Sequence, residues 1–341
     1  MSLLGVVLID VSVVTPRGSV RSRTAAAVSH LTLRQISAVL PPEQAWGLWA
    51  SRRIVSTIMD AFGPPLPRTP VRHVDERLPD GRRIVGEWVR APHAPEPENT
   101  DTAIYFLHGS GYAMCSPRTH RRLTAWLSAH TALPVFCLDY RLAPRHRFPT
   151  AADDTHAGWE WLQQQGFRPD RMAIAADSAG GHLAACLNLI PGLEAPGEDL
   201  KIPSRPDAAI LYNPIVDLLP PDGWDLAKRN GESGKRIAER AREISPIHHI
   251  RREDPPAPPM LLIHGRADTV TPIANSDRFA QLLRERGDAP AYYRLNGQNH
   301  AFILRGYGPD AVVAAGLFAT DRLLQGLGWL RGPSPLDGAE P

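Results

Sequence analysis

Hydrophobic positions in the second part of the chain alternate between short continuous runs and segments with helical spacing. Six apolar runs have the length and composition of strands that are buried on both faces: 102–109, 134–140, 171–176, 208–213, 259–265 and 290–295. Helix-like segments lie around or between them at 119–130, 153–165, 179–190, 273–286 and 310–327. Continuous apolar strands separated by helices predict a parallel sheet with helices on both faces.

A different pattern precedes these runs. Residues 71–77 and 83–89 flank an Asp80-Gly81 pair, which is a strong signal for a β-hairpin. With this hairpin in front, the predicted sheet has eight strands and is mostly parallel. The long polar insertion at 217–257 falls between two predicted strands, where a loop of this length is usually a lid or a binding element.

The N-terminal part has helical rather than strand-like patterning. Apolar residues recur at helical spacing within 24–63, and two proline pairs divide and end this segment. The apolar run at the start of the chain is interrupted by Asp10, is too short to span a bilayer and lacks a basic signal-peptide region. We therefore interpret residues 1–23 as a poorly packed leader or as a mis-called start.

The charge and the cysteine content limit the kinds of molecule that the protein is expected to bind and the cellular compartment in which it is expected to reside. The 38 basic and 36 acidic residues give a net charge of +2, which offers no electrostatic case for nucleic acid or an anionic membrane. The three cysteines Cys115, Cys137 and Cys186 have no metal-ligand spacing and lie in predicted apolar elements. Buried free thiols fit a reducing compartment, so we expect a cytoplasmic protein without a membrane span.

The most informative motif is AADSAGGHLAA at 175–185, which joins a short apolar strand to a helix. A sharp strand-to-helix turn exposes its central side chain, here Ser178, and requires small residues two positions before and after it. Ala176 and Gly180 meet that requirement, although the strict pattern has glycine at the first of these positions. The alternative is a glycine-rich turn that cradles a phosphate.

A nucleophilic serine needs a histidine base and a carboxylate that orients the base. Asp268 follows the fifth buried strand and His300 follows the sixth, so the chain order Ser178, Asp268, His300 is the one expected for acyl hydrolases with this type of turn. Weaker candidates for the acid and the base are Asp277, Asp288, His264, His248 and His249. The HGSGYAMCS loop at 108–116 could supply oxyanion donors, and we expect these to be the amides of Ser110, Gly111 and Ala179. Without the serine motif, this loop would be an ordinary glycine turn.

Four motifs together resemble one known family: HGSG, YRLAPRHRFP at 140–149, ADSAGG and HGRAD. They resemble the bacterial hormone-sensitive-lipase-like esterases, an α/β-hydrolase branch that includes many acetyl hydrolases, and the resemblance covers about 70–330. It implies an α/β-hydrolase catalytic domain at 71–341, an N-terminal helical cap at 1–70 and a second lid segment at 217–245. The sequence departs from the family pattern at Ser110, which replaces a glycine, and at Arg145, which replaces a glutamate. His108 and Gly109 would then support the oxyanion loop.

The resemblance implies a serine carboxylesterase that hydrolyses short-acyl, acetyl-type esters through an acyl-enzyme intermediate. No metal or organic cofactor is expected, the partner would be a small-molecule ester rather than nucleic acid, and the protein would be a monomer or a homodimer. The same triad would also serve an amidase, a lactonase, a deacetylase of a biosynthetic intermediate or an acyltransferase. A further alternative is a catalytically inactive receptor for small molecules.

Overall fold

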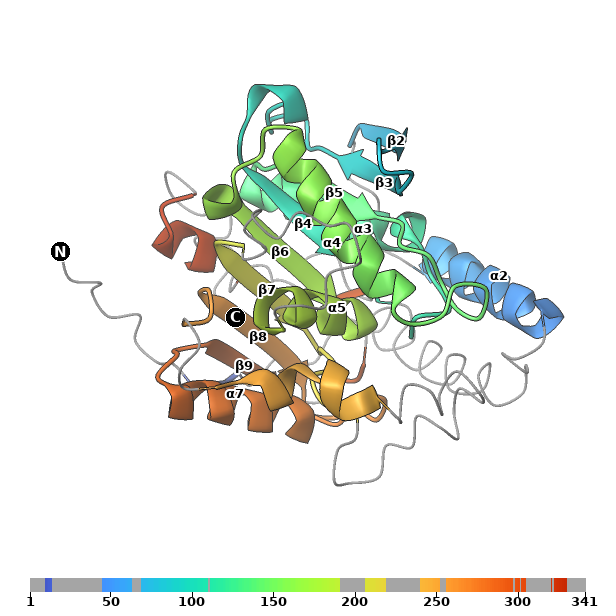
Figure 1. The fold of residues 1–341 in the computed structure, drawn as a ribbon. Helices are drawn as coiled ribbons and strands as arrows, with labels where there is room; N and C mark the ends of the chain where they lie inside the picture. Colours follow the sequence, from blue (N-terminus) through green and yellow to red (C-terminus); the bar gives the residue numbers. More distant parts are fainter. Residues whose placement is uncertain are drawn as a thin grey trace.

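A single mixed sheet forms the centre of the computed structural model (Figure 1). The structure describes residues 10–13, 45–62, 69–109, 111–190, 206–218, 240–251, 256–296, 298–300, 302–304, 320 and 322–329. Within these residues the sheet has nine strands in the order β1-β9-β8-β7-β6-β4-β5-β3-β2. Their bounds are Asp10–Val13 (β1), Val71–Arg77 (β2), Arg83–Val89 (β3), Ala103–Leu107 (β4), Val135–Leu138 (β5), Met172–Asp177 (β6), Ala208–Tyr212 (β7), Met260–Gly265 (β8) and Ala291–Leu295 (β9).

Strand directions agree with the sequence pattern. All neighbouring pairs from β1 to β5 are parallel, whereas β3 is antiparallel to both β2 and β5. The hairpin β2–β3 has the predicted bounds, and the Gly81 amide donates a hydrogen bond to the Leu78 carbonyl with a length of 2.9 Å. Gly81 has φ +88°, a conformation that glycine adopts without strain. The prediction of a mostly parallel sheet with a leading hairpin is therefore confirmed.

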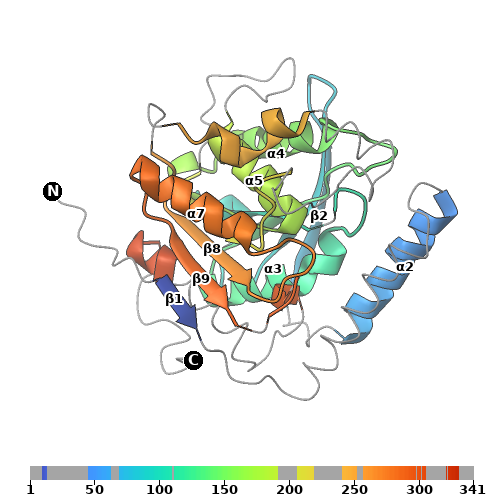
Figure 2. The same cartoon turned by 90° about the horizontal axis from the view of Figure 1, so that it is seen from below.

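The first strand departs from the prediction. Asp10–Val13 pairs in parallel with β9, with Asp10 opposite Tyr292 and Val13 opposite Leu295. The sheet therefore gains a ninth strand beyond the eight expected, and this part of 1–23 belongs to the sheet rather than to a leader. Figure 2 shows β1 beside β9 at one edge of the molecule.

Helices cover both faces of the sheet. The bounds of the helices are Ala45–Phe62 (α2), Pro117–Thr131 (α3), Thr150–Gln164 (α4), Ser178–Leu189 (α5) and Ala274–Arg286 (α7), with short 3-10 turns at Pro97–Asn99, Pro169–Arg171, Pro246–His249 and Phe302–Leu304. α4, α5 and α7 lie on one face, and α3 lies on the other together with the helical residues 322–326 (Figure 2). Among the described residues, no helix is both long enough and apolar enough to cross a bilayer.

The core follows from the alternation of side chains along the central strands. On β4, Tyr105 and Leu107 pack in the cluster that includes Trp159 of α4 and Phe279 of α7. Ile104 and Phe106 point to the opposite face and pack with residues of α3 and β5. Because both faces of the strand are buried, β4 is continuously apolar, as the sequence indicated.

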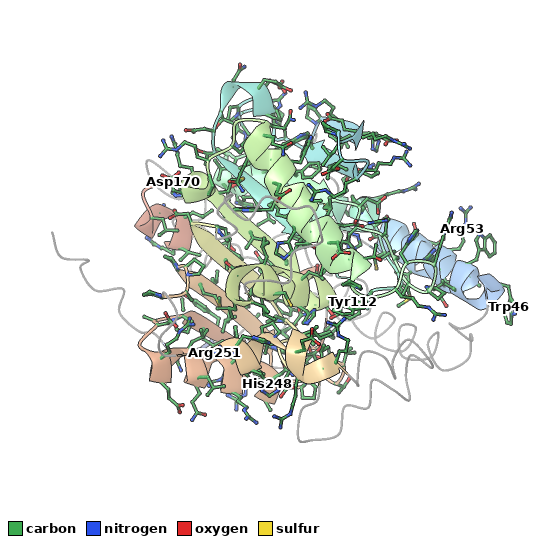
Figure 3. All side chains as sticks on the ribbon, in the orientation of Figure 1. Trp46, Arg53, Tyr112, Asp170, His248 and Arg251 are labelled. Atoms are coloured by element: carbon green, nitrogen blue, oxygen red, sulfur yellow. The ribbon has the colours of Figure 1, made fainter. Side chains whose placement is uncertain are left out.

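The helix α2 stands at the side of the sheet in both views (Figures 1 and 2). Its Arg52 guanidinium donates hydrogen bonds to the carbonyls of Ala113, at 2.9 Å, and Ala143, at 3.2 Å. Trp46 and Trp49 are exposed, and Figure 3 labels Trp46 and Arg53 on this helix. Most of the expected cap at 1–70, and residues 219–239 of the expected second lid segment, lie outside the described residues.

Candidate active site

The turn between β6 and α5 carries the predicted nucleophile. Ser178 is the first residue of α5 and has φ +51°, a strained backbone conformation for a residue with a side chain. A Cβ added at Gly180 would lie 2.1 Å from the Leu107 carbonyl oxygen, so only glycine allows α5 to approach the end of β4. Small residues around Ser178 are therefore needed because the turn packs directly against the neighbouring strand.

The three predicted triad residues meet at the carboxyl ends of the parallel strands. His300, in the loop after β9, has Nε2 at 2.8 Å from the Ser178 Oγ. Its other nitrogen, Nδ1, lies 2.7 Å from Oδ2 of Asp268, in the loop after β8. Both contacts have hydrogen-bond lengths, so the hydroxyl, the imidazole and the carboxylate form one continuous chain.

The Asp268 carboxylate is held from both sides. Its Oδ1 accepts hydrogen bonds from the amides of Val270, at 2.8 Å, and Thr271, at 2.9 Å. Its Oδ2 lies 3.2 Å from Nε2 of His264, in addition to the contact with His300. Burial alone would raise the pKa of Asp268, but the interactions with His300 and His264 outweigh burial and hold this pKa well below its usual range. Asp268 is therefore ionised at neutral pH.

The expected oxyanion donors are only partly within the described residues. Ser110 lies outside the described residues, whereas Gly111 is described with φ +53° and is exposed. Ala179 is buried in the first turn of α5, where backbone amides have no acceptor within their own helix. The amide of Ala179 is therefore adjacent to Ser178 at the start of α5.

The supporting loop is fixed by a residue that sequence reasoning did not assign. Asp177 Oδ1 accepts a 2.7 Å hydrogen bond from the Gly109 amide and lies 3.3 Å from Nε2 of His120. Burial alone would raise the pKa of Asp177, but His120 and the Gly109 amide hold it below its usual value. The position of Asp177 directly before the nucleophile was the only available signal, because nothing in the sequence pairs it with Gly109.

His108 lies beneath this loop and is fully buried. Its ring stacks on Tyr140 with a centroid distance of 4.3 Å, and the Tyr140 hydroxyl donates a 2.5 Å hydrogen bond to the His108 carbonyl. Burial, together with nearby His120, lowers the pKa of His108 to about 3. The ring of His108 therefore stays neutral at ordinary pH.

The weaker candidates are engaged elsewhere, with one exception. Asp277 accepts hydrogen bonds from Tyr292 and Arg294, and Asp288 pairs with Arg286. His248 lies 3.8 Å from Asp217, and Nε2 of His249 lies 2.6 Å from the Glu243 carbonyl; Figure 3 labels His248 at the lower edge of the molecule. His264 is the exception, because it contacts Asp268.

The described residues also bear on metal binding and on the thiols. Within the described ranges, no group of three or more His, Cys, Asp or Glu side chains is arranged to hold a metal ion. Cys137 and Cys186 are buried free thiols, whereas Cys115 is half-buried and has φ +66° in the loop before α3. The expectation of an apolar element around Cys115 was therefore wrong.

Comparison with known proteins identifies the family. A family model of the α/β-hydrolase fold matches residues 104–304, a range that runs from the second residue of β4 past β9 and includes Ser178, Asp268 and His300. The chain belongs to the α/β-hydrolase fold family. The resemblance to bacterial hormone-sensitive-lipase-like esterases is likewise confirmed by the relatives that match this hydrolase chain.

Two curated relatives are similar over the central part of this α/β-hydrolase chain. The carboxylesterase/phospholipase LipF of Mycobacterium tuberculosis is 36% identical over 132 residues, which are 39% of this chain and 33% of LipF. An ethyl acetate hydrolase of Pseudomonas putida is 38% identical over 112 residues, 32% of this chain and 35% of that protein. The match thus spans about one third of the length of these relatives.

Solved structures match over a longer range. Esterase 2 of Thermogutta terrifontis, bound to butyrate, superposes with a TM-score of 0.64 at 28% identity and covers 80% of this chain and 98% of its own. The same esterase phosphorylated by paraoxon superposes with a TM-score of 0.63 at 27% identity, covering 79% of this chain and 98% of its own. The likeness therefore extends over nearly the whole of that esterase.

Proposed function

We propose that this α/β hydrolase is a serine carboxylesterase acting on short-acyl esters. The observation that carries the proposal is the hydrogen-bonded chain from Ser178 Oγ through His300 to Asp268, with lengths of 2.8 and 2.7 Å. A serine hydroxyl is a weak nucleophile, and an adjacent imidazole that is oriented by a carboxylate is the arrangement that activates it.

The chemistry follows from this geometry. Ser178 Oγ attacks the ester carbonyl carbon while Nε2 of His300 takes the hydroxyl proton. The tetrahedral intermediate then collapses, His300 returns the proton to the departing alcohol oxygen, and the acyl group remains on Ser178. Water, deprotonated by His300, attacks the acyl-enzyme and releases the carboxylic acid and the free serine. Ionised Asp268 keeps the His300 proton on Nδ1 and stabilises the imidazolium at each stage.

Negative charge that develops on the carbonyl oxygen needs preorganised donors. The amides of Ser110, Gly111 and Ala179 would supply them, with His108 and Gly109 supporting the loop. The support for this role is the hydrogen bond from the Gly109 amide to Asp177, since it ties the loop to the residue that precedes Ser178. The oxyanion loop and the nucleophile turn would therefore move as one unit.

Two observations support the proposed preference for short acyl groups: the apolar side chains around Ala179 and the names of matched proteins. Ala179 packs with Ile215, Leu218, Ala241 and Ile244 in one apolar cluster, with Tyr112 and Phe148 against it. Ala241 and Ile244 come from the 217–245 segment, as a lid that lines the substrate site would require. The names of two matched proteins, an ethyl acetate hydrolase and an esterase with bound butyrate, indicate small acyl groups in those proteins.

We extend the proposal to the architecture and setting of the enzyme. The N-terminal cap at 1–70 would contribute α2, which Arg52 ties to Ala113 of the 108–116 loop and to Ala143, while the catalytic domain at 71–341 would carry the triad. The free thiols support a cytoplasmic location, because a reducing compartment preserves them. A monomer or homodimer is proposed, and light scattering of the purified protein measures which of the two forms.

The direct test combines a chain-length series of p-nitrophenyl esters with Ser178→Ala. We expect the wild type to hydrolyse the acetate and butyrate esters best and to lose this activity in Ser178→Ala. Paraoxon should modify the wild type once, at Ser178, which mass spectrometry of the peptides detects. Ser128→Ala is the matched control, because Ser128 lies on α3 and its hydroxyl bonds the Ala91 amide and the Leu133 carbonyl rather than a triad residue.

Two results would reject the proposal. Equal slow hydrolysis by the wild type and Ser178→Ala would favour an inactive receptor. Faster turnover of an amide than of the matched ester would favour an amidase with the same triad.

A further inference from the structure

His264 is a buried histidine that the triad mechanism leaves without a role. It belongs to β8, is completely buried and stands in register with Arg294 of β9. Its Nε2 lies 2.8 Å from the Thr271 carbonyl oxygen and 3.2 Å from Oδ2 of Asp268. Its Nδ1 lies 2.8 Å from the Ser276 hydroxyl on α7. Every polar atom of this ring therefore faces a partner.

The partners determine where the ring carries its hydrogen. Both atoms near Nε2 are acceptors, a carbonyl oxygen and a carboxylate oxygen, so Nε2 must be protonated. The Ser276 hydroxyl can donate a hydrogen bond to an unprotonated Nδ1. The neutral ring with its hydrogen on Nε2 therefore has a hydrogen-bond partner at both nitrogens. The hydrogen on Nε2 lies between Thr271 and Asp268, and it supplies a second imidazole donor to the triad carboxylate.

The same carboxylate oxygen is thus shared by two histidines. Oδ2 of Asp268 faces Nδ1 of His300 at 2.7 Å and Nε2 of His264 at 3.2 Å, while two backbone amides hold Oδ1. Rotating the carboxylate would break contacts at both oxygens at once. A second donor on Oδ2 also withdraws electron density from the bond to His300, because hydrogen bonds to a charged acceptor share its charge.

The other charged groups nearby are paired among themselves. Arg294, the register partner of His264, donates a 2.7 Å hydrogen bond to Asp277 of α7. The ionisable side chains whose interactions set the charge of Asp268 are His300 and His264. A change at His264 should therefore reach the reaction through Asp268.

We propose that His264 is a positioning residue that acts through Asp268, fixing the carboxylate and setting how strongly it holds the His300 imidazolium. This inference rests on the proposed esterase function for its kinetic readout. His264 touches neither the substrate nor the Ser178 hydroxyl; its effect is on the protonation of His300 and on the geometry of the acid.

The test compares His264→Leu with His264→Gln. Leucine removes the donor, whereas the glutamine amide can place an N–H near the position of Nε2. With the donor lost, Asp268 binds the imidazolium more strongly, so the acid limb of the pH profile of kcat/KM should move about half a unit or more to higher pH. We expect kcat to fall about 10-fold with little change in KM, in line with the loss of one hydrogen bond to a charged group. Glutamine should restore the wild-type acid limb.

A matched control separates this role from simple loss of a buried histidine. His156 is buried on α4, so His156→Leu should lower the unfolding temperature without moving the pH profile. If His264→Leu keeps the wild-type acid limb, the proposal is wrong and His264 only stabilises the fold. Should His264→Leu fail to fold, His264→Phe decides, since it keeps a ring in the buried position but has no donor for Asp268: an unchanged acid limb there rejects the proposal equally.

A readout independent of activity distinguishes failure of this inference from failure of the esterase proposal. In a Ser178→Ala background, proton NMR follows the His300 proton that faces Asp268 as pH is varied. Adding His264→Leu to that background should shift the midpoint of this titration upward. No shift would overturn the role of His264 even if the protein proved to be an esterase, and a shift would support it even if no ester were cleaved.

Discussion

Gly109→Ala tests whether the oxyanion loop and the nucleophile turn are packed too closely for any side chain between them. A Cβ at Gly109 would lie 2.2 Å from Oδ2 of Asp177, although real Cβ contacts are essentially never shorter than 3.0 Å. The two groups must therefore separate by roughly 0.8 Å. Either the loop retreats or Asp177 shifts the adjacent Ser178, so the reacting atoms lose their alignment in both cases.

The size of the expected effect follows from this displacement. A misplacement of about 1 Å costs about 100-fold in rate, and the loss of one oxyanion donor costs about 100- to 1,000-fold. We expect kcat/KM of Gly109→Ala for p-nitrophenyl acetate to fall about 100-fold, mostly in kcat. Stopped-flow or plate assays of the purified variant measure this change directly.

The control is Gly326→Ala, since an added Cβ there meets no atom within 4 Å. It should have wild-type activity and an unchanged circular dichroism spectrum. If folded Gly109→Ala keeps kcat/KM within about threefold of the wild type, then the loop does not depend on its contact with Asp177, and our reasoning about the oxyanion site is refuted.

Three further predictions concern the acid, the core and pH. Asp268→Asn should lower kcat by about 10⁴-fold without unfolding the protein, because an amide cannot hold His300 in the required tautomer; retained activity would remove Asp268 from the triad. Gly158→Ala should destabilise the fold by about 1–3 kcal/mol in urea unfolding, since its Cβ would lie 2.4 Å from the Tyr105 hydroxyl; wild-type stability would show that α4 adjusts freely. The lowered pKa of Asp177 makes its contribution to stability present above the unfolded value near 3.8 and lost as pH falls through the lower folded pKa. The unfolding free energy of the wild type should thus fall more steeply below about pH 4 than that of Asp177→Asn, and equal slopes would contradict this.

The predictable part of the molecule is the part with local signatures. Continuous apolar strands, the Asp80-Gly81 turn and the small residues around Ser178 each reflect a constraint that acts within a few positions. The chain order of Ser178, Asp268 and His300 then followed from where each lies relative to a strand. These features could be predicted because side-chain alternation and backbone crowding each restrict which residue types occur at neighbouring positions.

The remaining features depend on contacts between distant segments. The strand β1 has only four residues and begins with Asp10, so no alternating pattern marks it, and its pairing with β9 decides its structure. Asp177 is buried against Gly109 and His120, which lie 57 or more positions away in the sequence. The sequence placed His264 only among the weaker candidates for the base. Its contact with Asp268 forms when the loop after β8 folds back, and nothing in the local sequence indicates that contact.

The pairing of β1 with β9 has a consequence for how the protein is made. Asp10 emerges from the ribosome 282 residues before its partner Tyr292, which corresponds to about 15 to 55 s of synthesis at typical rates. His300 likewise follows Ser178 by 122 residues. The nascent chain must therefore carry an unpaired first strand and an unactivated serine until residues 291–300 have been synthesised. The strand that pairs with β1 and the loop that carries His300 are adjacent in the sequence, so the serine gains its base only when the partner of the first strand has also been made.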